Sequence, residues 1–137
     1  MLTNDLPRIV DWVCRHCDAD PRNASAAIGW LRDDDLTAGV YYEDFTGASI
    51  TATIAMSPGA VMSKDFLWTI FDYPFNQLGC DKMVALIADA NWKSKAMVER
   101  MGFTKEAEIA NYYPAGEALT IYTITKQQCR FLENNDG

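Results

Sequence analysis

The sequence lacks an excess of positive charge. Its 12 lysines and arginines stand against 19 aspartates and glutamates, which gives a formal net charge of −7 at pH 7. A protein that binds nucleic acid needs a basic surface that releases counterions from phosphates, so this balance argues against a nucleic-acid partner. An acidic protein is instead compatible with cationic partners such as amines.

Long hydrophobic runs are also missing. No apolar stretch approaches the roughly 18 residues that a membrane-spanning helix needs. The N-terminal sequence MLTNDLPRIV does not show the basic-then-apolar pattern of a signal peptide. The chain has 137 residues, of which 49% are hydrophobic, and this suits one sizeable core. We therefore expect a single domain over residues 1–137 with a disordered tail at about 133–137, located in the cytoplasm and without contact to a membrane.

Metal-ligating residues are scarce. The only histidine, His16, lies between Cys14 and Cys17, while Cys80 and Cys129 are isolated. A structural zinc site needs four ligands, usually from two such clusters, so we expect no metal and reduced thiols. A redox CxxC would follow a strand, whereas this one lies late in a helical stretch. A metal or redox module remains the alternative that zinc analysis of the purified protein would decide.

The hydrophobic periodicity of the first half predicts one helix and three strands. Apolar residues at helical spacing predict an amphipathic helix from Leu6 to Cys17. Short β-rich runs separated by acidic or glycine turns then predict an antiparallel meander, with strands at 26–32, 37–44 and 49–56. Gly29 and Gly39 fall inside strands, where they mark a bulge or a close backbone approach.

The second half alternates strands and helices. Ser63 is a suitable N-cap for a helix that ends near Gly79, and Pro74 predicts a kink or an early end. The apolar run 82–88 predicts a central strand covered on both faces. Asn91 as N-cap and Gly102 as positive-φ stop bound a further helix. Two strands follow, at 105–113 and 119–126.

This order of elements carries a resemblance. Asn91 opens the helix after the buried strand, Ser94 follows three residues later, and Met-Gly-Phe-Thr-Lys-Glu closes it at residues 101–106. Over roughly residues 26–126, the chain resembles the GCN5-related N-acetyltransferases (GNAT). With FDYPFNQLG at 71–79, it looks most similar to small acetyltransferase-like proteins of tailed phages. The resemblance implies an α/β (α+β) fold with a mixed, mostly antiparallel sheet flanked by helices and two central parallel strands, 49–56 and 82–88, splayed apart.

The resemblance also implies a cosubstrate, acetyl-CoA, whose amide-bearing arm would lie between the splayed strands. Its pyrophosphate would lie at the start of the helix that follows residues 57–65, because helix-end amides favour anions. The residues expected to contact it are Met56, through its backbone N–H near the reacting carbonyl, and Ser63, Lys64, Asn91, Ser94 and Lys95.

Two positions depart from the family pattern. The usual phosphate loop (Gln or Arg, two residues, Gly, one residue, Gly or Ala) is replaced by SPGAVMSKD at 57–65, and Val98 stands where many members place a tyrosine that protonates the leaving thiolate. Strand 49–56 contains no carboxylate, so Glu43 and Asp44 are the nearest candidates for a base. Their ordinary interpretation is an acidic turn.

Three tyrosines are candidates for the missing acid, although tyrosine is common in strands for packing reasons. They are Tyr112, Tyr113 and Tyr122, and we select Tyr113 as the acid and Glu43 as the base. The four tryptophans are expected to pack in or near the core, and Trp30 is the one that could line an acceptor cleft.

The leading hypothesis is an N-acetyltransferase that moves an acetyl group from acetyl-CoA to a primary amine by direct attack. The acceptor is an amine on a small molecule or a protein, and the protein could act as a homodimer. The competing hypothesis is a catalytically degenerate GNAT-fold protein with a structural or host-interaction role in a phage. If the protein is phage-encoded, its location is the host cytoplasm.

Overall fold

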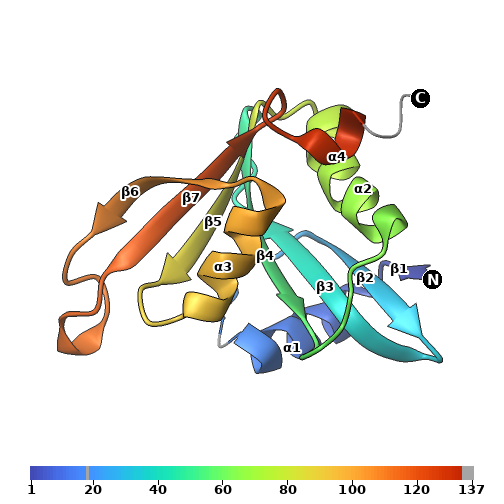
Figure 1. Cartoon of the computed structure of the whole chain (residues 1–137), viewed down its shortest axis with the longest axis horizontal. Helices are drawn as coiled ribbons and strands as arrows, with labels where there is room; N and C mark the ends of the chain where they lie inside the picture. The colour runs from blue at the N-terminus through green and yellow to red at the C-terminus, as the bar shows by residue number, and fades with distance from the viewer. Residues whose placement is uncertain (18, 134–137) are drawn as a thin grey trace.

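The computed structural model describes residues 1–17 and 19–133. Its elements follow one another as α- and 3₁₀- or π-helical segments and strands (Figure 1): β1 (Leu2–Thr3), α1 (Leu6–Cys17), β2 (Ala26–Arg32), β3 (Asp35–Glu43), β4 (Ser49–Met56), α2 (Lys64–Asp72), a π-helical turn (Tyr73–Gln77), β5 (Lys82–Ala88), α3 (Trp92–Met101), β6 (Thr104–Ile109), a 3₁₀ turn (Pro114–Gly116), β7 (Leu119–Thr125) and α4 (Arg130–Glu133). The predicted disordered tail falls almost wholly outside the described residues.

The described strands form one mixed sheet of seven strands in the order β1-β2-β3-β4-β5-β7-β6. All neighbouring pairs are antiparallel except β4 and β5, which run parallel. Strands β2, β3 and β4 form the predicted meander, and its first turn contains Asp33 and Asp34 with φ of 52° and 68°. The connection from β4 through α2 to β5 is a helical crossover of the kind that parallel neighbours require.

Helices cover the two faces of the sheet unequally. On one face α1 packs against β2, β3 and β4 through a small core of six buried residues: Ile9, Val13, Ala27, Leu36, Tyr41 and Ala55. On the other face α2, α3 and α4 enclose the larger core, which reaches from β3 across to β7 (Figure 1). Among the described residues, no helix packs on the α1 face of β5, β7 and β6, and the site described below lies beside this open half of the sheet.

Gly29 and Gly39 lie opposite each other on β2 and β3. A Cβ atom on Gly29 would lie 2.8 Å from Leu36 Cδ2 and 3.1 Å from Ile9 Cγ1, and one on Gly39 would lie 3.1 Å from Val13 Cγ2. The two glycines thus let α1 approach the sheet closely, which is one of the two interpretations that the sequence allowed.

Helix α2 ends earlier than its hydrophobic pattern suggests. Ser63 caps it, since the Phe66 N–H donates to Ser63 Oγ at 3.0 Å, but the regular helix stops at Asp72 and continues as the π-helical turn. Pro74 has no N–H to donate to the carbonyl of Ile70. The buried hydroxyl of Tyr42 donates to that carbonyl at 2.6 Å. The predicted early end at Pro74 is confirmed, and Tyr42 supplies the replacement donor.

Helix α3 has the ends that its sequence predicts. Asn91 Oδ1 accepts the N–H of Ser94 at 3.2 Å. At the other end Gly102 adopts φ 106° in the left-handed region, and its N–H and that of Phe103 return to the last turn. Met97, Val98 and Met101 are buried against the larger core, as the helical spacing predicted.

Two predictions about strands were wrong. Strand β5 is not covered on both faces: Met83, Ala85 and Ile87 are buried, whereas the alternate residues remain half-buried because α1 does not extend over them. The strand predicted at 105–113 ends at Ile109, because the chain turns at Asn111, where φ is 55°. Residues 110–118 instead form a loop between β6 and β7 that reaches the site.

Candidate active-site cleft

The parallel strands β4 and β5 diverge after three residue pairs. Ser49, Ile50 and Thr51 pair with residues 82, 83 and 84, and the ladder ends there. Strand β4 nevertheless continues beside β3 to Met56, and β5 continues beside β7 to Ala88. Alternate residues of a strand point their N–H and C=O groups to opposite edges, so the facing edges of β4 and β5 beyond this point carry backbone groups without a ladder partner. Figure 1 shows the two strands meeting at one end and separating at the other.

A cavity of about 800 Å³ occupies this gap. Its walls come from five parts of the chain: the end of α1 with the loop after it, the ends of β3 and β4, strand β5, the start of α3, and the β6–β7 loop. We call it the cleft. Its narrow end lies where the β4–β5 ladder stops, and its wide end lies beyond Ala88, at the start of α3 and the β6–β7 loop.

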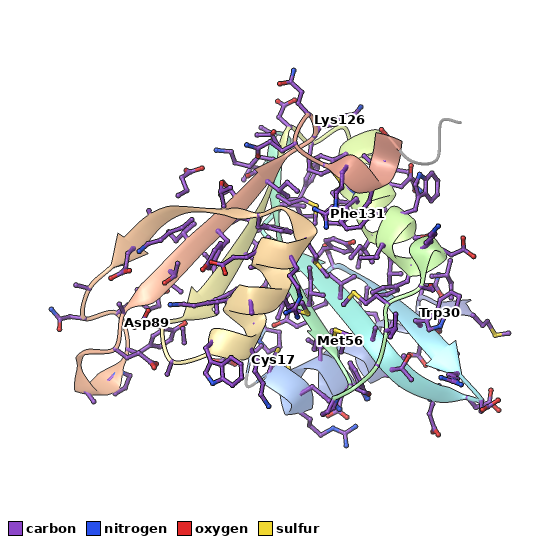
Figure 2. The ribbon with its side chains drawn as sticks, in the orientation of Figure 1. Cys17, Trp30, Met56, Asp89, Lys126 and Phe131 are labelled. Carbon is purple, nitrogen blue, oxygen red and sulfur yellow. The ribbon has the colours of Figure 1, made fainter. Side chains whose placement is uncertain are left out.

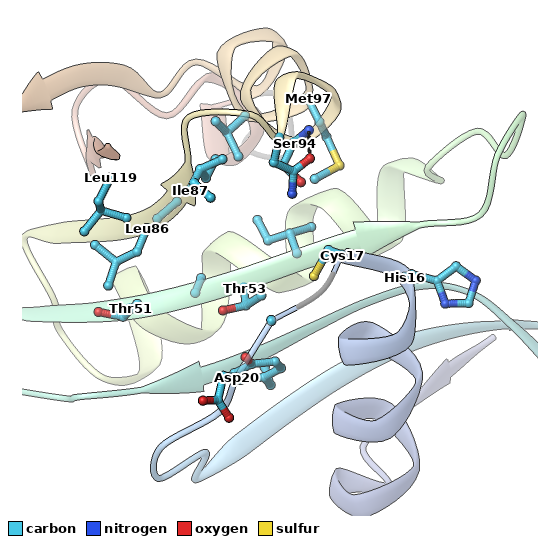
Figure 3. Close-up of a pocket in the computed structure, with 18 of the residues that line it drawn as sticks. His16, Cys17, Asp20, Thr51, Thr53, Leu86, Ile87, Ser94, Met97 and Leu119 are labelled. Atoms are coloured by element: carbon cyan, nitrogen blue, oxygen red, sulfur yellow. Dashed lines mark hydrogen bonds between the residues drawn. The ribbon is translucent and has the colours of Figure 1, made fainter. Parts of the chain in front are cut away.

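The wall formed by α3 contains Asn91, Ser94, Met97 and Val98. Figure 3 shows Ser94 and Met97 on this side, opposite Thr51 and Thr53 of β4. The Asn91 side-chain oxygen is engaged in capping, which leaves its amide N–H₂ group for another acceptor. Val98, at 2% exposure, contributes no polar group at the position where the family resemblance expects an acid.

The opposite wall carries polar groups from β3 and β4. Glu43 lies opposite Thr51, and Tyr41 lies opposite Thr53, so all four side chains share one face of the sheet. Burial raises the pKa of the Tyr41 hydroxyl well above its usual value, and the neighbouring Thr53 acts in the opposite direction. Tyr41 therefore stays protonated at neutral pH.

Glu43 is a buried carboxylate, 3% exposed, held by the α1–β2 loop. Its Oε2 accepts the backbone N–H of Arg22 at 2.9 Å and that of Asn23 at 3.0 Å. Its Oε1 lies 3.4 Å from the guanidinium of Arg22, which also pairs with Asp44. The hydrogen bond to Asp44 raises the pKa of Arg22, so this guanidinium is a permanent cation beside two carboxylates.

The β6–β7 loop closes the wide end with Tyr112, Tyr113 and Glu117. The two tyrosine rings meet edge to face, with centroids 4.9 Å apart. The pKa of Tyr113 is raised by burial, by Tyr112 and by Glu117, and it is lowered by Arg22. The Tyr113 hydroxyl thus lies within the electrostatic reach of charged groups from both walls and stays protonated at neutral pH.

Four of the eight predicted site residues line the cleft: Glu43, Tyr113, Asn91 and Ser94. Lys95 points elsewhere and pairs with the Asp89 carboxylate, whose pKa it lowers. Trp30 does not line the cleft; it packs against the larger core, on the β2 side of the molecule and far from Asp89 (Figure 2).

The other three predicted residues do not line the cleft. Met56 ends β4 and packs partly against the larger core. Ser63 caps α2 and Lys64 is the exposed first residue of that helix. The first-turn amides of α2 and the Lys64 ammonium provide the positive potential that an anion requires. The seven residues of 57–63 connect β4 to this helix end.

Several cleft residues carried no sequence signal for a site. Asp20, Arg22, Thr53 and Glu117 lie in loops or at strand positions with ordinary composition. Only the tertiary structure places them around one cavity, because they come from segments that are far apart along the chain. The doublet Tyr112-Tyr113 next to a Pro-Ala-Gly turn was the one local hint that the loop before β7 is functional.

The CxxC segment lies at the C-terminal end of α1. Cys17 Sγ donates to the carbonyl of Val13 at 3.2 Å, and burial raises the pKa of Cys14, with Asp11, Asp20 and Glu43 acting in the same direction. The thiolate that metal binding and thiol exchange require is therefore disfavoured at Cys14. Within residues 1–17 and 19–133 no group of three or more His, Cys, Asp or Glu side chains gathers in a way that would hold a metal ion. No helix in that part of the chain has the length and apolar character needed to cross a bilayer.

The sequence matches no known protein-family profile and no curated protein. Solved structures, however, share its fold. Mutant forms of the spermidine/spermine N-acetyltransferase SpeG from Vibrio cholerae superpose with a TM-score of 0.72 at 14% identity, covering 98% of this chain and 98% of that one. Another mutant of the Vibrio cholerae spermidine N-acetyltransferase superposes with a TM-score of 0.66 at 19% identity, covering 82% and 70% of the two chains. A GNAT-family acetyltransferase from Bacillus anthracis gives 0.62 at 13% identity, covering 74% and 66%.

These identities establish the fold and nothing finer. The chain has the GNAT fold: a mixed, mostly antiparallel sheet flanked by helices, with one parallel pair that splays apart. The predicted fold class is confirmed.

Proposed function

We propose that the protein is an N-acetyltransferase that transfers an acetyl group from acetyl-CoA to a primary amine by direct attack, without a covalent enzyme intermediate. The observation that carries this proposal is the cleft itself. Unpaired strand edges and the α3 start form one wall, and a buried carboxylate faces them from the other. A single domain over residues 1–137 and a cytoplasmic location, within a host if the gene belongs to a phage, complete the proposal.

The residues present fit the arm of acetyl-CoA well and its phosphates less closely. The gap between β4 and β5 offers amide donors and acceptors to an extended arm, and the Asn91 amide and Ser94 hydroxyl stand beside it. The phosphates would lie towards the amides of the first turn of α2 and Lys64. When bound, acetyl-CoA supplies the acetyl thioester.

The chain's own groups then divide the proton transfers. Glu43, at the narrow end, takes the proton that the amine loses. A backbone N–H of β4 just beyond Thr51, where the ladder with β5 has ended, stabilises negative charge on the reacting carbonyl oxygen. Met56 lies five residues further along β4, roughly 16 Å from Thr51, and is therefore a contact for the arm of acetyl-CoA rather than the donor to that oxygen. Tyr113, which stays protonated at neutral pH, lies at the wide end of the cleft. It would supply the proton that the leaving CoA thiolate takes up, through intervening water, in place of the acid missing at Val98.

The acceptor is an amine on a small molecule or a protein. The solved structures that share the fold include enzymes named for spermidine and spermine, so polyamines are the first compounds to test. A homodimer is part of the proposal, since a second copy would cover some of the open α1 face of β5, β7 and β6.

The second candidate is a catalytically inactive protein of the same fold with a structural or host-interaction role in a phage. Val98 at the acid position and the unusual segment 57–65 favour it. Both proposals predict a folded cleft, but only the enzyme proposal predicts acetyl transfer to an amine.

Isothermal titration calorimetry with acetyl-CoA, followed by an assay of CoA thiol release in the presence of spermidine, decides between them. We expect saturable binding and amine-dependent release. Absence of binding at millimolar acetyl-CoA would overturn the enzyme proposal. Binding without release for any amine would support the inactive protein instead.

A further inference from the structure

The charged groups that line the cleft do not balance. Arg15 pairs with Asp11 at 2.9 Å, and the single guanidinium of Arg22 is shared by Glu43 and Asp44. Asp20 and Glu117 also line the cleft and take part in no ion pair in the described part of the chain. The lining thus contains the carboxylates of Asp20, Glu43 and Glu117 and the guanidiniums of Arg15 and Arg22, both of which are already paired, so negative charge is in excess there.

Glu117 is the best-held of the unpaired carboxylates. Its backbone carbonyl accepts the N–H groups of Tyr112 and Tyr113, at 3.2 and 2.9 Å. Its side-chain Oε2 accepts the backbone N–H of Ala90 at 3.2 Å, so the carboxylate ties the β6–β7 loop to the connection between β5 and α3. One carboxylate oxygen remains for a ligand, on a side chain whose position is already determined.

An aromatic surface lies next to this carboxylate. The rings of Tyr112 and Tyr113 pack edge to face in the same loop and both line the cleft. The faces of aromatic rings attract ammonium groups, and a carboxylate beside such rings adds direct charge pairing. The combination recognises an alkylammonium cation better than a neutral or anionic group.

Glu117 and Glu43 mark the two ends of the cleft. Glu43 lies opposite Thr51, where the β4–β5 ladder stops at Val84. Glu117 contacts Ala90, beyond the end of β5 at Ala88. The rise of a strand, roughly 3.3 Å per residue over the six residues from Val84 to Ala90, puts the two ends at most about 20 Å apart.

We propose that Glu117 is a specificity-determining residue that binds a second ammonium group of the acceptor at the wide end of the cleft, while the reacting amine lies at the narrow end. The acceptor is then a linear alkyl diamine or polyamine. This inference rests on the proposed acetyl transfer, which places the reacting amine at the narrow end of the cleft. Binding of the diamine can nevertheless be measured without any acetyl transfer.

The test compares α,ω-diaminoalkanes of increasing chain length with monoamines of matched length, on the protein and on Glu117→Gln. Glutamine keeps an oxygen for the Ala90 N–H and removes only the charge. We expect diamines of suitable length to bind about fivefold to tenfold more tightly than monoamines, as calorimetry without acetyl-CoA reports, and Glu117→Gln to abolish that preference. In the transfer assay the loss appears in KM for the diamine rather than in kcat.

Glu108→Gln is the matched control, since Glu108 is an exposed carboxylate of β6 that pairs with Lys105 and does not line the cleft. It should leave the diamine preference intact. A preference that survives in Glu117→Gln, or one that falls equally in Glu108→Gln, overturns the inference. Diamine binding that depends on Glu117 without transfer to any amine would uphold the inference and refute the acetyltransferase proposal, so the two failures are distinguishable.

Discussion

Glu43 and Arg22 are joined twice, once through the backbone and once through the side chains. The Arg22 N–H donates to Glu43 Oε2 at 2.9 Å, and the guanidinium lies 3.4 Å from Oε1. This double connection fastens the loop after α1 to the end of β3 and so shapes one wall of the cleft. The same carboxylate is the proposed base, which means that its structural and chemical contributions have to be measured separately.

Replacement of Glu43 by glutamine should lower both stability and turnover. Glutamine loses the charge that its backbone and guanidinium donors favour, so we expect the free energy of unfolding to fall by about 2 kcal/mol in urea denaturation. The kcat of the folded variant should fall about 100-fold if Glu43 accepts the amine proton. Asp44→Asn is the control: Asp44 pairs with the same guanidinium but is more exposed, so its loss should cost less than about 1 kcal/mol. Equal losses in the two variants would refute the structural role of Glu43.

Removal of the Tyr42 hydroxyl should destabilise the fold without touching the cleft. Tyr42→Phe leaves the Ile70 carbonyl without its 2.6 Å donor, at a position where Pro74 has no N–H to offer. We expect a loss of about 2 kcal/mol by urea denaturation. Tyr122→Phe provides the comparison, because the Tyr122 hydroxyl donates to Glu99, which is exposed and can bind water instead. That variant should lose less than about 1 kcal/mol at neutral pH; a larger loss there than in Tyr42→Phe would refute this explanation.

Tyr122 should make stability depend on alkaline pH. Burial, followed by the hydrogen bond to Glu99, raises the pKa of Tyr122 to about 12 from its ordinary 10.0. Because the unfolded chain releases this proton first, the stabilisation from the neutral hydroxyl is complete below pH 10 and declines as the pH rises from 10 to about 12. The difference in unfolding free energy between the protein and Tyr122→Phe should therefore be constant up to pH 10 and shrink above it. Glu99→Gln should narrow the pH range over which this stabilisation is lost, because the hydrogen bond to Glu99 contributes to the raised pKa of Tyr122. A difference in unfolding free energy that stays constant from neutral pH to pH 12 would contradict the raised pKa of Tyr122.

The contribution of Asn91 to helix capping should be measurable separately from its contribution to acetyl-CoA binding. Asn91→Ala loses the cap on Ser94 and should cost about 1 kcal/mol of stability, whereas Asn91→Asp keeps a good N-cap and loses only the side-chain N–H₂ group. We expect both variants to bind acetyl-CoA about tenfold more weakly in calorimetry. If the aspartate variant binds as tightly as the unmodified protein, Asn91 acts as a cap alone.

Local sequence signals were sufficient where the determining contacts lie within one or two turns. Asn91 and Gly102 bound α3 as predicted, because an N-cap and a left-handed stop act on backbone groups three or four residues away. Strand bounds at 49–56 and 82–88 were likewise correct, since each is delimited by turn residues. The end of β6 was missed because the turn at Asn111 has φ 55°, and its sequence differs little from that of a strand.

The cleft itself depended on contacts between distant segments. That strands β4 and β5 stop pairing after Thr51 follows from how each is held by its other neighbour, β3 or β7, and no short stretch encodes that competition. The fold could be assigned from the sequence because the family pattern around α3 lies within one short stretch of the chain. The partners of Glu43 and the position of Glu117 could only come from folding, because Arg22 and Ala90 lie more than twenty residues away along the chain. The sequence determines which chemical groups the chain carries. Which of those groups line one cavity depends on how distant segments pack together in the folded protein.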